Sequence, residues 1–187
     1  NTIPGHTFIV DASFGHIRYF KNGLNSIDVE NNFKATYDII NSKRKVVKNL
    51  RDIAKTVDEV VIATDQDREG EAIGYHLIKV LGLNLENTKR ICFNEITKTA
   101  IISAFNSPTT LDMDMFNAQQ ARSVLDLLIG YNISPLLWKA IQPKLSAGRC
   151  QSPALRLVCE REKEINDFQS NSSYELQAKF NISLKDN

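Results

Sequence analysis

The chain has 187 residues, of which 42% are apolar and 24% are charged, and this is the composition of an ordinary folded protein. Its net charge of +1 excludes a protein that attracts nucleic acid through overall charge, so any such contact must come from locally placed Lys and Arg. Its three cysteines form no CxxC pair, which supports neither a disulfide framework nor a zinc ribbon. No apolar run is long enough to span a bilayer and the first residues do not look like a signal peptide, so we expect no membrane partner.

The first half of the chain predicts a layer of alternating strands and helices. Short apolar runs that are typical of buried strands occur at three places, 7–10, 60–63 and 90–93. Residues 21–35 are polar and rich in Asn, so we expect a loop there. Apolar residues at helical spacing predict one helix capped by Ser42, a second that ends at Gly82 and a third capped by Thr97. This order is typical of an α/β domain with a mostly parallel sheet.

The second half, after Ser107-Pro108, predicts helices only, as far as the end of the 160s. An apolar stripe predicts a helix over 116–129, and the pairs Ser134-Pro135 and Ser152-Pro153 each predict the start of a further helix. Alternating residues at 174–184 predict a strand. We therefore expect an α/β domain, an all-helical domain and the start of a β-rich domain, at 1–108, 109–170 and 171–187.

An acidic loop follows the apolar run at 60–63. Side chains at alternate positions of an extended backbone point the same way, so Asp65 and Asp67 would face one point, with Glu69 near enough to join them. Carboxylates this close repel each other, and a divalent cation relieves the repulsion; Mg²⁺ suits a site that offers few protein oxygens. Alternatively, the aspartates only cap the following helix, and Glu69 and Glu71 only complement its dipole.

The helix predicted over 116–129 has a polar face opposite its apolar stripe. This face carries, at helical spacing, Gln119, Arg122, Ser123 and Asp126. Asp126 can accept a hydrogen bond from Arg122 and fix the guanidinium, whose other donors are then available for a phosphate. Tyr131, expected just past the helix, offers a ring on which an unpaired base can stack. A solvated helix face is the alternative interpretation.

A second candidate DNA contact lies at Gly148-Arg149-Cys150-Gln151, directly before the helix start predicted at Ser152. Free backbone N–H groups and the positive end of a helix favour an anion there, and Arg149 adds positive charge. The basic run Lys43-Arg44-Lys45 with Lys48 is interpreted instead as the solvated face of a helix whose other side is apolar.

These motifs together resemble the type IA DNA topoisomerase family. The acidic loop, continued as Arg68-Glu-Gly-Glu-Ala-Ile, is similar to the signature of the Toprim domain in that family. Four further segments resemble the family in the right order: Ser13-Phe-Gly-His-Ile-Arg18, Phe93-Asn-Glu-Ile-Thr97, Gln119 to Trp138, and Ser146 to Pro153. The resemblance covers nearly the whole chain and implies a Rossmann-like α/β Toprim domain, with its first strand missing, followed by a helical DNA-binding domain.

The resemblance implies an ATP-independent reaction that relaxes negatively supercoiled DNA. A tyrosine attacks a phosphodiester of one strand and holds the 5′ phosphate, another strand passes, and the break is resealed. It further implies that the acidic loop binds Mg²⁺ as cofactor and that His16 acts near the reacting phosphate. The cut strand, a single-stranded segment of DNA, is expected to contact Arg122, Tyr131, Arg149 and Gln151.

The sequence departs from the family pattern in three ways. The family has a second basic residue after Arg122, where this chain has Ser123. The glutamate of the first Toprim strand is expected before residue 1. The nucleophilic tyrosine normally precedes an Arg by two positions, and none of the five tyrosines here does so. We therefore expect a segment that supplies the metal site and the DNA grip and that, alone, cuts no DNA.

Two other functions stay open at this point. Another Toprim enzyme, such as a primase or nuclease, would share the acidic loop but not the segment from Gln119 to Trp138. A non-catalytic module that binds single-stranded DNA would gain nothing from three acids near phosphate. We expect a monomer, in the cytoplasm or wherever the DNA genome resides. The motifs do not distinguish the topoisomerase I, topoisomerase III and reverse gyrase kinds.

Overall fold

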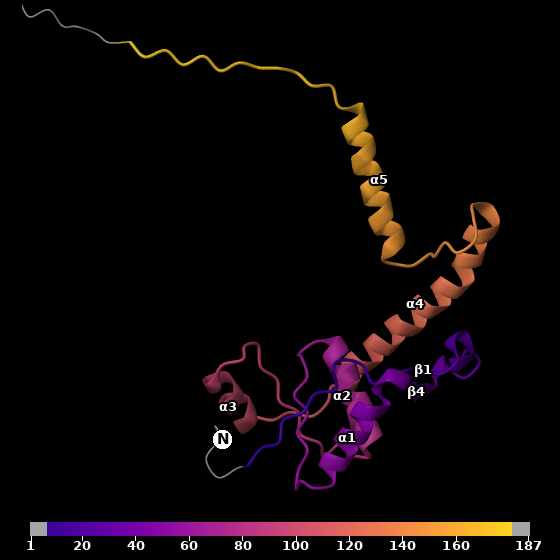
Figure 1. Ribbon diagram of the computed structural model, residues 1–187, viewed down its shortest axis with the longest axis vertical. Helices are drawn as coiled ribbons and strands as arrows, with labels where there is room; N and C mark the ends of the chain where they lie inside the picture. Colours follow the sequence, from indigo (N-terminus) through magenta and orange to yellow (C-terminus); the bar gives the residue numbers. More distant parts are fainter. Residues whose placement is uncertain (1–6, 181–187) are drawn as a thin grey trace, which may run out of the picture. The chain divides into compact units, whose positions relative to one another are not determined.

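The computed structural model describes residues 7–180, and its contacts divide the chain after Gly148 into two compact units, Asn1–Gly148 and Arg149–Asn187 (Figure 1). The described elements of the first unit are, in chain order, β1 (Arg18–Phe20), η1 (Gly23–Ser26), β2 (Ile27–Asp28), β3 (Lys34–Ala35), β4 (Tyr37–Ile39), η2 (Asn41–Lys43), α1 (Arg44–Ala54), α2 (Arg68–Leu81), α3 (Lys98–Asn106) and α4 (Met113–Ala140). The second unit contains α5 (Gln151–Asp167). The boundaries expected near residues 108 and 171 remain predictions.

Strand pairing in the first unit is short and mostly antiparallel. β1 pairs with β4, so that Phe20 lies opposite Tyr37, and β2 pairs with β3. The segments expected as buried strands at 60–63 and 90–93 meet at one parallel bridge between Ile62 and Arg90. The described residues therefore place these two segments side by side, but they do not show the mostly parallel, Rossmann-like sheet that the sequence predicts.

Three segments differ from the prediction. Residues 7–10 are exposed and form no strand, because no neighbouring strand pairs with them in the described part of the chain. The expected loop at 21–35 contains η1 and the β2–β3 hairpin instead; Asp28 accepts a hydrogen bond from the backbone N–H of Asn31, which stabilises the turn. Residues 174–180 form no strand, and 181–184 lie outside the described residues.

The helices predicted in the first half of the chain are confirmed as α1, α2 and α3. Asp67 caps α2 by accepting a hydrogen bond from Gly70 N, and Gly82, with a φ of 71°, ends it in the left-handed conformation. Thr97 caps α3 through Ala100 N. The cap expected from Ser42 is wrong, since this residue lies in the short helix η2 and its side chain caps nothing.

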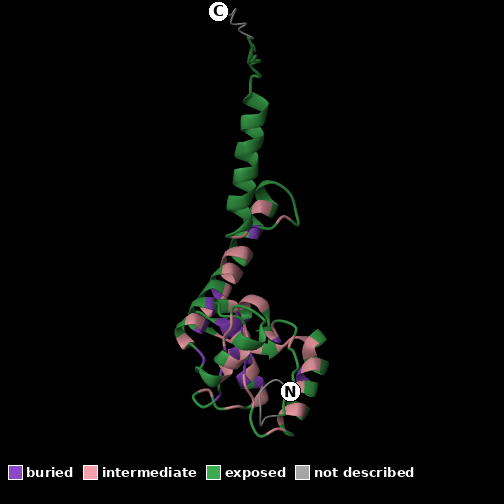
Figure 2. Cartoon of the chain, turned by 90° about the vertical axis from the view of Figure 1, so that its left-hand side faces the viewer, coloured by how far each residue is buried: buried purple, intermediate pink, exposed green. Residues whose placement is uncertain are grey.

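The helix start expected at Ser134-Pro135 is also wrong, because α4 continues through Pro135 without a break in its assignment. The Ser134 side chain is buried and accepts a hydrogen bond from Ala147 N at 3.1 Å, so its hydroxyl holds the segment that follows the helix and does not cap a new one. α5 begins at Gln151, within two residues of the predicted start, and its residues are exposed throughout (Figure 2). No helix in the described residues has the length and apolar content to cross a membrane.

The core of the first unit consists of three small apolar clusters. Ile17, Val47 and Val80 join the segment before β1 to α1 and α2. A second cluster joins the β hairpins to α4, through Phe20, Ile27 and Val124. The third joins the Ile62 bridge to α2 and to the segment that leads into α4, through Ile62, Ile78 and Leu111. Each cluster includes α2 or α4, so these two helices organise the unit (Figure 1).

His76 of α2 is buried among aromatic rings. It is 3% exposed and packs against Tyr37, Tyr75 and Phe116 at centroid distances of 4.7, 5.6 and 6.0 Å. Its Nδ1 has no hydrogen-bond partner. Burial, together with the positive charge of Arg18, lowers the pKa of His76 to about 3, so the folded protein holds this ring neutral.

His76 is predicted to destabilise the fold in acid. Because its pKa is about 3 when folded and close to the ordinary 6.5 when unfolded, the unfolded state takes up the proton first as pH falls through that window. The free energy of unfolding should lose about 1.4 kcal/mol per pH unit below about pH 6.5 from this residue alone. Urea denaturation of the wild type and of His76→Phe across this pH range gives the free energy of unfolding of each. Its slope against pH should be shallower for the variant; equal slopes would contradict the burial of a neutral ring.

Candidate metal and DNA site

The acidic loop occupies the N-terminal end of α2, after the Ile62 bridge. Asp65 is exposed, and its carboxylate has no hydrogen bond or ion pair among the described residues. Asp67 is also exposed and uses Oδ1 to accept from Gly70 N at 2.7 Å, which leaves its second oxygen toward solvent. Glu69 lies in the first turn of α2. The alternative interpretation, in which both aspartates cap the helix, is therefore correct for Asp67 only, because Asp65 does not cap α2.

Two contacts hold the backbone carbonyl of Asp65. A Cβ built on Gly70 would lie 2.0 Å from the carbonyl oxygen of Asp65, so only glycine permits this approach. The Nη2 of Arg90 donates to the same carbonyl at 2.8 Å and to that of Thr64 at 3.4 Å. Arg90 also forms a buried ion pair with Glu71 at 2.9 Å. Burial raises the pKa of the Glu71 carboxyl, and the Arg90 guanidinium opposes that shift.

Glu69 connects the acidic loop to two other elements. Its Oε2 lies 3.1 Å from the Nε2 of His16, before β1, and accepts from the Nε2 of Gln119, on α4, at 3.1 Å. Its Oε1 lies 4.0 Å from the Nη1 of Arg122. Gln119 also donates to the hydroxyl of Ser123 at 2.9 Å. The position at which the family has a second basic residue therefore holds a hydroxyl that orients Gln119.

A cavity of about 240 Å³ opens beside this cluster. It is lined by charged, polar and aromatic side chains from the segment before β1, from the paired strands β1 and β4, and from α2 and α4: His16, Arg18, Tyr19, Phe20, Tyr37, Glu69, His76, Gln119, Arg122, Ser123 and Asp126. At its rim, Arg122 Nε lies 3.8 Å from Asp126 Oδ2. Of the predicted site residues, the structure thus brings together His16, Glu69, Arg122 and Asp126.

The remaining predicted DNA contacts lie elsewhere. The expectation that Tyr131 follows the end of the helix is wrong, because α4 continues to Ala140 and includes it; Tyr131 is 54% exposed, and its hydroxyl packs close to Gly23. Arg149 and Gln151 belong to the second unit, where Gln151 begins α5 and both residues are exposed. The structure of the first unit accordingly places Tyr131 on the same helix as Arg122, while Arg149 and Gln151 sit at the start of another helix.

Sequence reasoning missed several residues of this region. Arg18 and Phe20 follow His16 at alternate positions of an extended segment, which is the signal that could have placed them beside it. His76 lies two helical turns after Glu69 and so shares its side of α2. Burial raises the pKa of the cavity-lining Tyr37 hydroxyl. No local sequence pattern predicts the ion pair of Arg90 with Glu71, because it joins residues 19 positions apart.

The donor set of the acidic loop fits a magnesium ion. Asp65 and Asp67 offer only oxygen, and both are exposed directly after an extended segment. Mg²⁺ retains several waters and is bound through one or two carboxylates, so it does not require a cage of protein ligands. Among residues 7–180, no group of three or more His, Cys, Asp or Glu side chains is arranged to hold a metal ion. Such a cage is what a structural zinc or calcium site would need.

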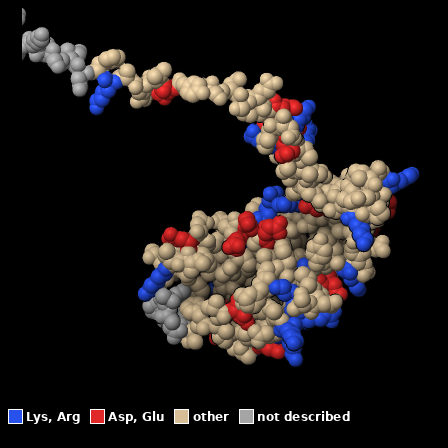
Figure 3. Space-filling model, turned by 45° about the horizontal axis from the view of Figure 1, so that its top comes forward, with Lys and Arg blue, Asp and Glu red and all other residues tan. Residues whose placement is uncertain are grey.

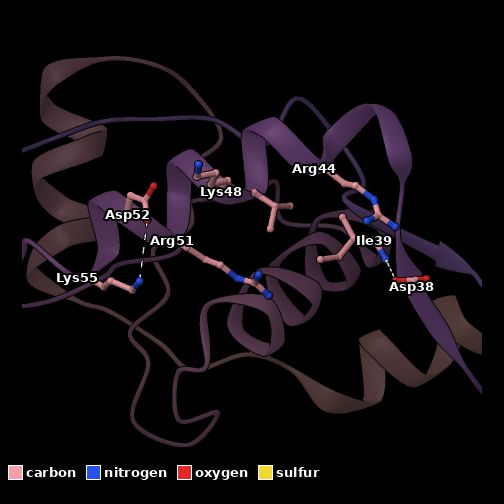
Figure 4. A pocket seen from close by; sticks show the side chains of 8 residues that line it. Asp38, Ile39, Arg44, Lys48, Arg51, Asp52 and Lys55 are labelled. Carbon is pink, nitrogen blue, oxygen red and sulfur yellow. Dashed lines mark hydrogen bonds and ion pairs between the residues drawn. The ribbon is translucent and has the colours of Figure 1, made fainter.

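A second cavity, of about 360 Å³, shares no lining residue with the first. Its wall contains the basic side chains of α1 (Figure 4), but Asp52 lies 4.0 Å from Lys55, and Arg51 donates to the carbonyl of Val80 at 2.9 Å. Both acidic and basic side chains lie on the face of the first unit seen in Figure 3, where neither sign covers the whole face. Lys43 differs from the predicted solvated face: its Nζ donates to the carbonyl of Phe14 at 2.5 Å, beside the turn that leads to His16.

Comparison with known proteins decides which family these features represent. Residues 3–96 match the Toprim domain, and residues 110–187 match the DNA topoisomerase family. The structure of full-length topoisomerase I from Thermotoga maritima is similar, with 43% sequence identity over 90% of this chain and a TM-score of 0.77. The chain belongs to the type IA DNA topoisomerase family. The topoisomerase match beyond the Toprim domain separates it from the primases and nucleases considered above. This chain spans 29% of the length of the Thermotoga protein.

Gly70 is predicted to be essential for the acidic loop of this topoisomerase chain. Gly70→Ala should cost about 1–3 kcal/mol of unfolding free energy, because its methyl group overlaps the Asp65 carbonyl and must displace the loop. The matched control is Gly130→Ala in α4, where a Cβ meets nothing closer than 3.8 Å and should stabilise by about 0.5–1 kcal/mol. Chemical denaturation measures both; equal effects would refute the close approach.

Proposed function

We propose that the protein is a Mg²⁺-dependent, ATP-independent type IA topoisomerase that relaxes negative supercoils through a 5′-phosphotyrosine. This chain supplies the cation site and part of the grip on the single-stranded segment. Because it spans 29% of the matched topoisomerase, the activity of the whole protein is proposed by similarity. We also propose an α/β domain up to residue 108 and a helical domain at 109–170, action as a monomer, and a place in the compartment that holds the genome.

The observation that carries the proposal is the meeting of the acidic loop with the polar face of α4. Glu69 accepts from Gln119 and lies near Arg122, so the residue two positions after Asp67 contacts the helix predicted to hold DNA. A DNA strand that lies along the polar face of α4 would therefore pass the carboxylates of the acidic loop. The 240 Å³ cavity between them contains both charge signs and aromatic rings, which suits a nucleotide better than an apolar ligand.

Asp65 and Asp67 would hold the cation. Glu69, the third carboxylate of the predicted metal site, lies next to them in sequence and contacts His16 and Gln119. When bound, Mg²⁺ would stabilise negative charge that develops on the oxygens of the transferred phosphate. His16, fixed by Glu69 at 3.1 Å, would orient toward the same phosphate and serve as a donor to it. Arg122, braced by Asp126, would offer its remaining guanidinium donors to a neighbouring phosphate.

The rest of the proposed grip combines a ring and a helix terminus. Tyr131 presents an exposed ring one to two turns along α4 from Asp126, and unpaired bases stack on such rings whatever their sequence. Arg149 and Gln151 lie at the N-terminal end of α5, where the positive end of the helix dipole favours a phosphate.

This grip predicts that the chain binds single-stranded DNA in preference to duplex. With few phosphate contacts, the slope of log K against log salt should be only about −2 to −3, at roughly −0.7 per contact. Arg122→Ala and Arg149→Ala should each weaken binding in fluorescence anisotropy titrations.

Two controls match these variants. Lys45→Ala removes an exposed charge from α1, and Arg156→Ala removes one that is already paired with Glu160 on α5. Both should change the affinity little. Equal losses from all four substitutions would mean nonspecific charge attraction, and the proposed grip would be wrong.

A further inference from the structure

Arg90 is a buried cation whose two terminal nitrogens contact groups beneath the acidic loop, whereas its Nε has no hydrogen-bond partner. Its residue is 3% exposed, and the guanidinium contacts the Asp65 and Thr64 carbonyls, the Glu71 carboxylate and the sulfur of Cys92. Backbone pairing fixes the base of the side chain, since Ile62 N donates to Lys89 O and Ile91 N donates to Ile62 O, each at 2.9 Å. The guanidinium therefore joins two neighbouring extended segments beneath the acidic loop.

Glu71 extends this connection to α4. It is 4% exposed, and while Oε1 pairs with Arg90, Oε2 accepts from the backbone N–H of Asp112 at 3.2 Å. Asp112 is the N-cap residue of α4. The two buried side chains thus link the backbone of the acidic loop to the first turn of the helix that carries Arg122.

We propose that Arg90 and Glu71 are positioning residues of the cation site, which fix the direction of the Asp65 carboxylate through its own backbone. This inference rests on the proposed cation site at Asp65 and Asp67. Neither residue would touch the cation; Arg90 donates to the Asp65 carbonyl, which Gly70 also approaches closely, and the two contacts together restrict the position of the Asp65 peptide. A fixed pair of carboxylates favours Mg²⁺, which requires near-ideal octahedral geometry, over the larger and more tolerant Ca²⁺.

The test compares Mg²⁺ and Ca²⁺ binding in Arg90→Lys, by following the amide resonances of residues 65–70 of the 187-residue chain during titration. Lysine keeps a positive charge opposite Glu71, but its donors share one nitrogen and lack the planar spacing with which the two guanidinium nitrogens reach the carboxylate and the two carbonyls. Mg²⁺ affinity should fall about tenfold, the lower end of the effect of residues that orient metal ligands. Ca²⁺ affinity should fall less, so the Mg²⁺-to-Ca²⁺ affinity ratio should drop. A ratio that stays constant would show a merely structural role and would overturn the inference.

Two further variants make the outcome unambiguous. Lys89→Ala breaks the adjacent, half-exposed ion pair with Glu59 and should leave both affinities unchanged, because exposed pairs contribute little. If Arg90→Lys does not fold, the double variant Glu71→Gln/Arg90→Gln removes both buried charges together and should show the same drop in the ratio.

The variant Asp65→Asn distinguishes a failure of the positioning role from a failure of the proposed cation site. If this variant leaves Mg²⁺ binding unchanged, the proposed cation site itself is wrong. If it abolishes binding while Arg90→Lys and the double variant keep the wild-type affinity and ratio, the cation site stands and the positioning role does not.

Discussion

The buried ion pair between Arg90 and Glu71 joins the three segments on which the site is built: the acidic loop, the start of α2 and the start of α4. Burying two charges costs free energy that their attraction only partly offsets, and apolar residues of similar volume often stabilise a fold as well or better. The pair is therefore poorly explained as a source of stability. What it adds is position, because its hydrogen bonds specify where the Asp65 carbonyl and the Asp112 amide lie.

The charges around the loop are balanced by groups from other elements. Asp65, Asp67, Glu69 and Glu71 fall within seven consecutive residues, and the mutual repulsion of their charges would disfavour this arrangement by itself. The positive end of the α2 dipole and the Asp67 cap offset part of it, and Glu69 gains His16, Gln119 and Arg122. Asp65 is the carboxylate left without such a partner in the described residues, which is where a cation would be most favourable.

Features set by neighbouring residues could be predicted from the sequence. Asp67 and Gly82 bound α2 because a cap and a left-handed terminus depend on the local backbone, and the polar face of α4 follows from helical spacing alone. Features set by distant contacts could not. Ser134 has the sequence of a helix start, but its hydroxyl accepts a hydrogen bond from Ala147, and residues 7–10 have the composition of a strand but pair with no strand in the described part of the chain. The Arg90–Glu71 pair belongs to the same class, and so do the contacts of His76 with Tyr37 and Phe116, because they join residues far apart in the sequence.

The claim that the acidic loop is the cation site can be tested most directly by crystallography with Mn²⁺ in place of Mg²⁺. Anomalous scattering locates the metal without reference to the fold. We expect one principal anomalous peak, with the carboxylates of Asp65 and Asp67 as its protein ligands, and its loss in Asp65→Asn. A principal peak bound by other residues, or one that persists in Asp65→Asn, would contradict it.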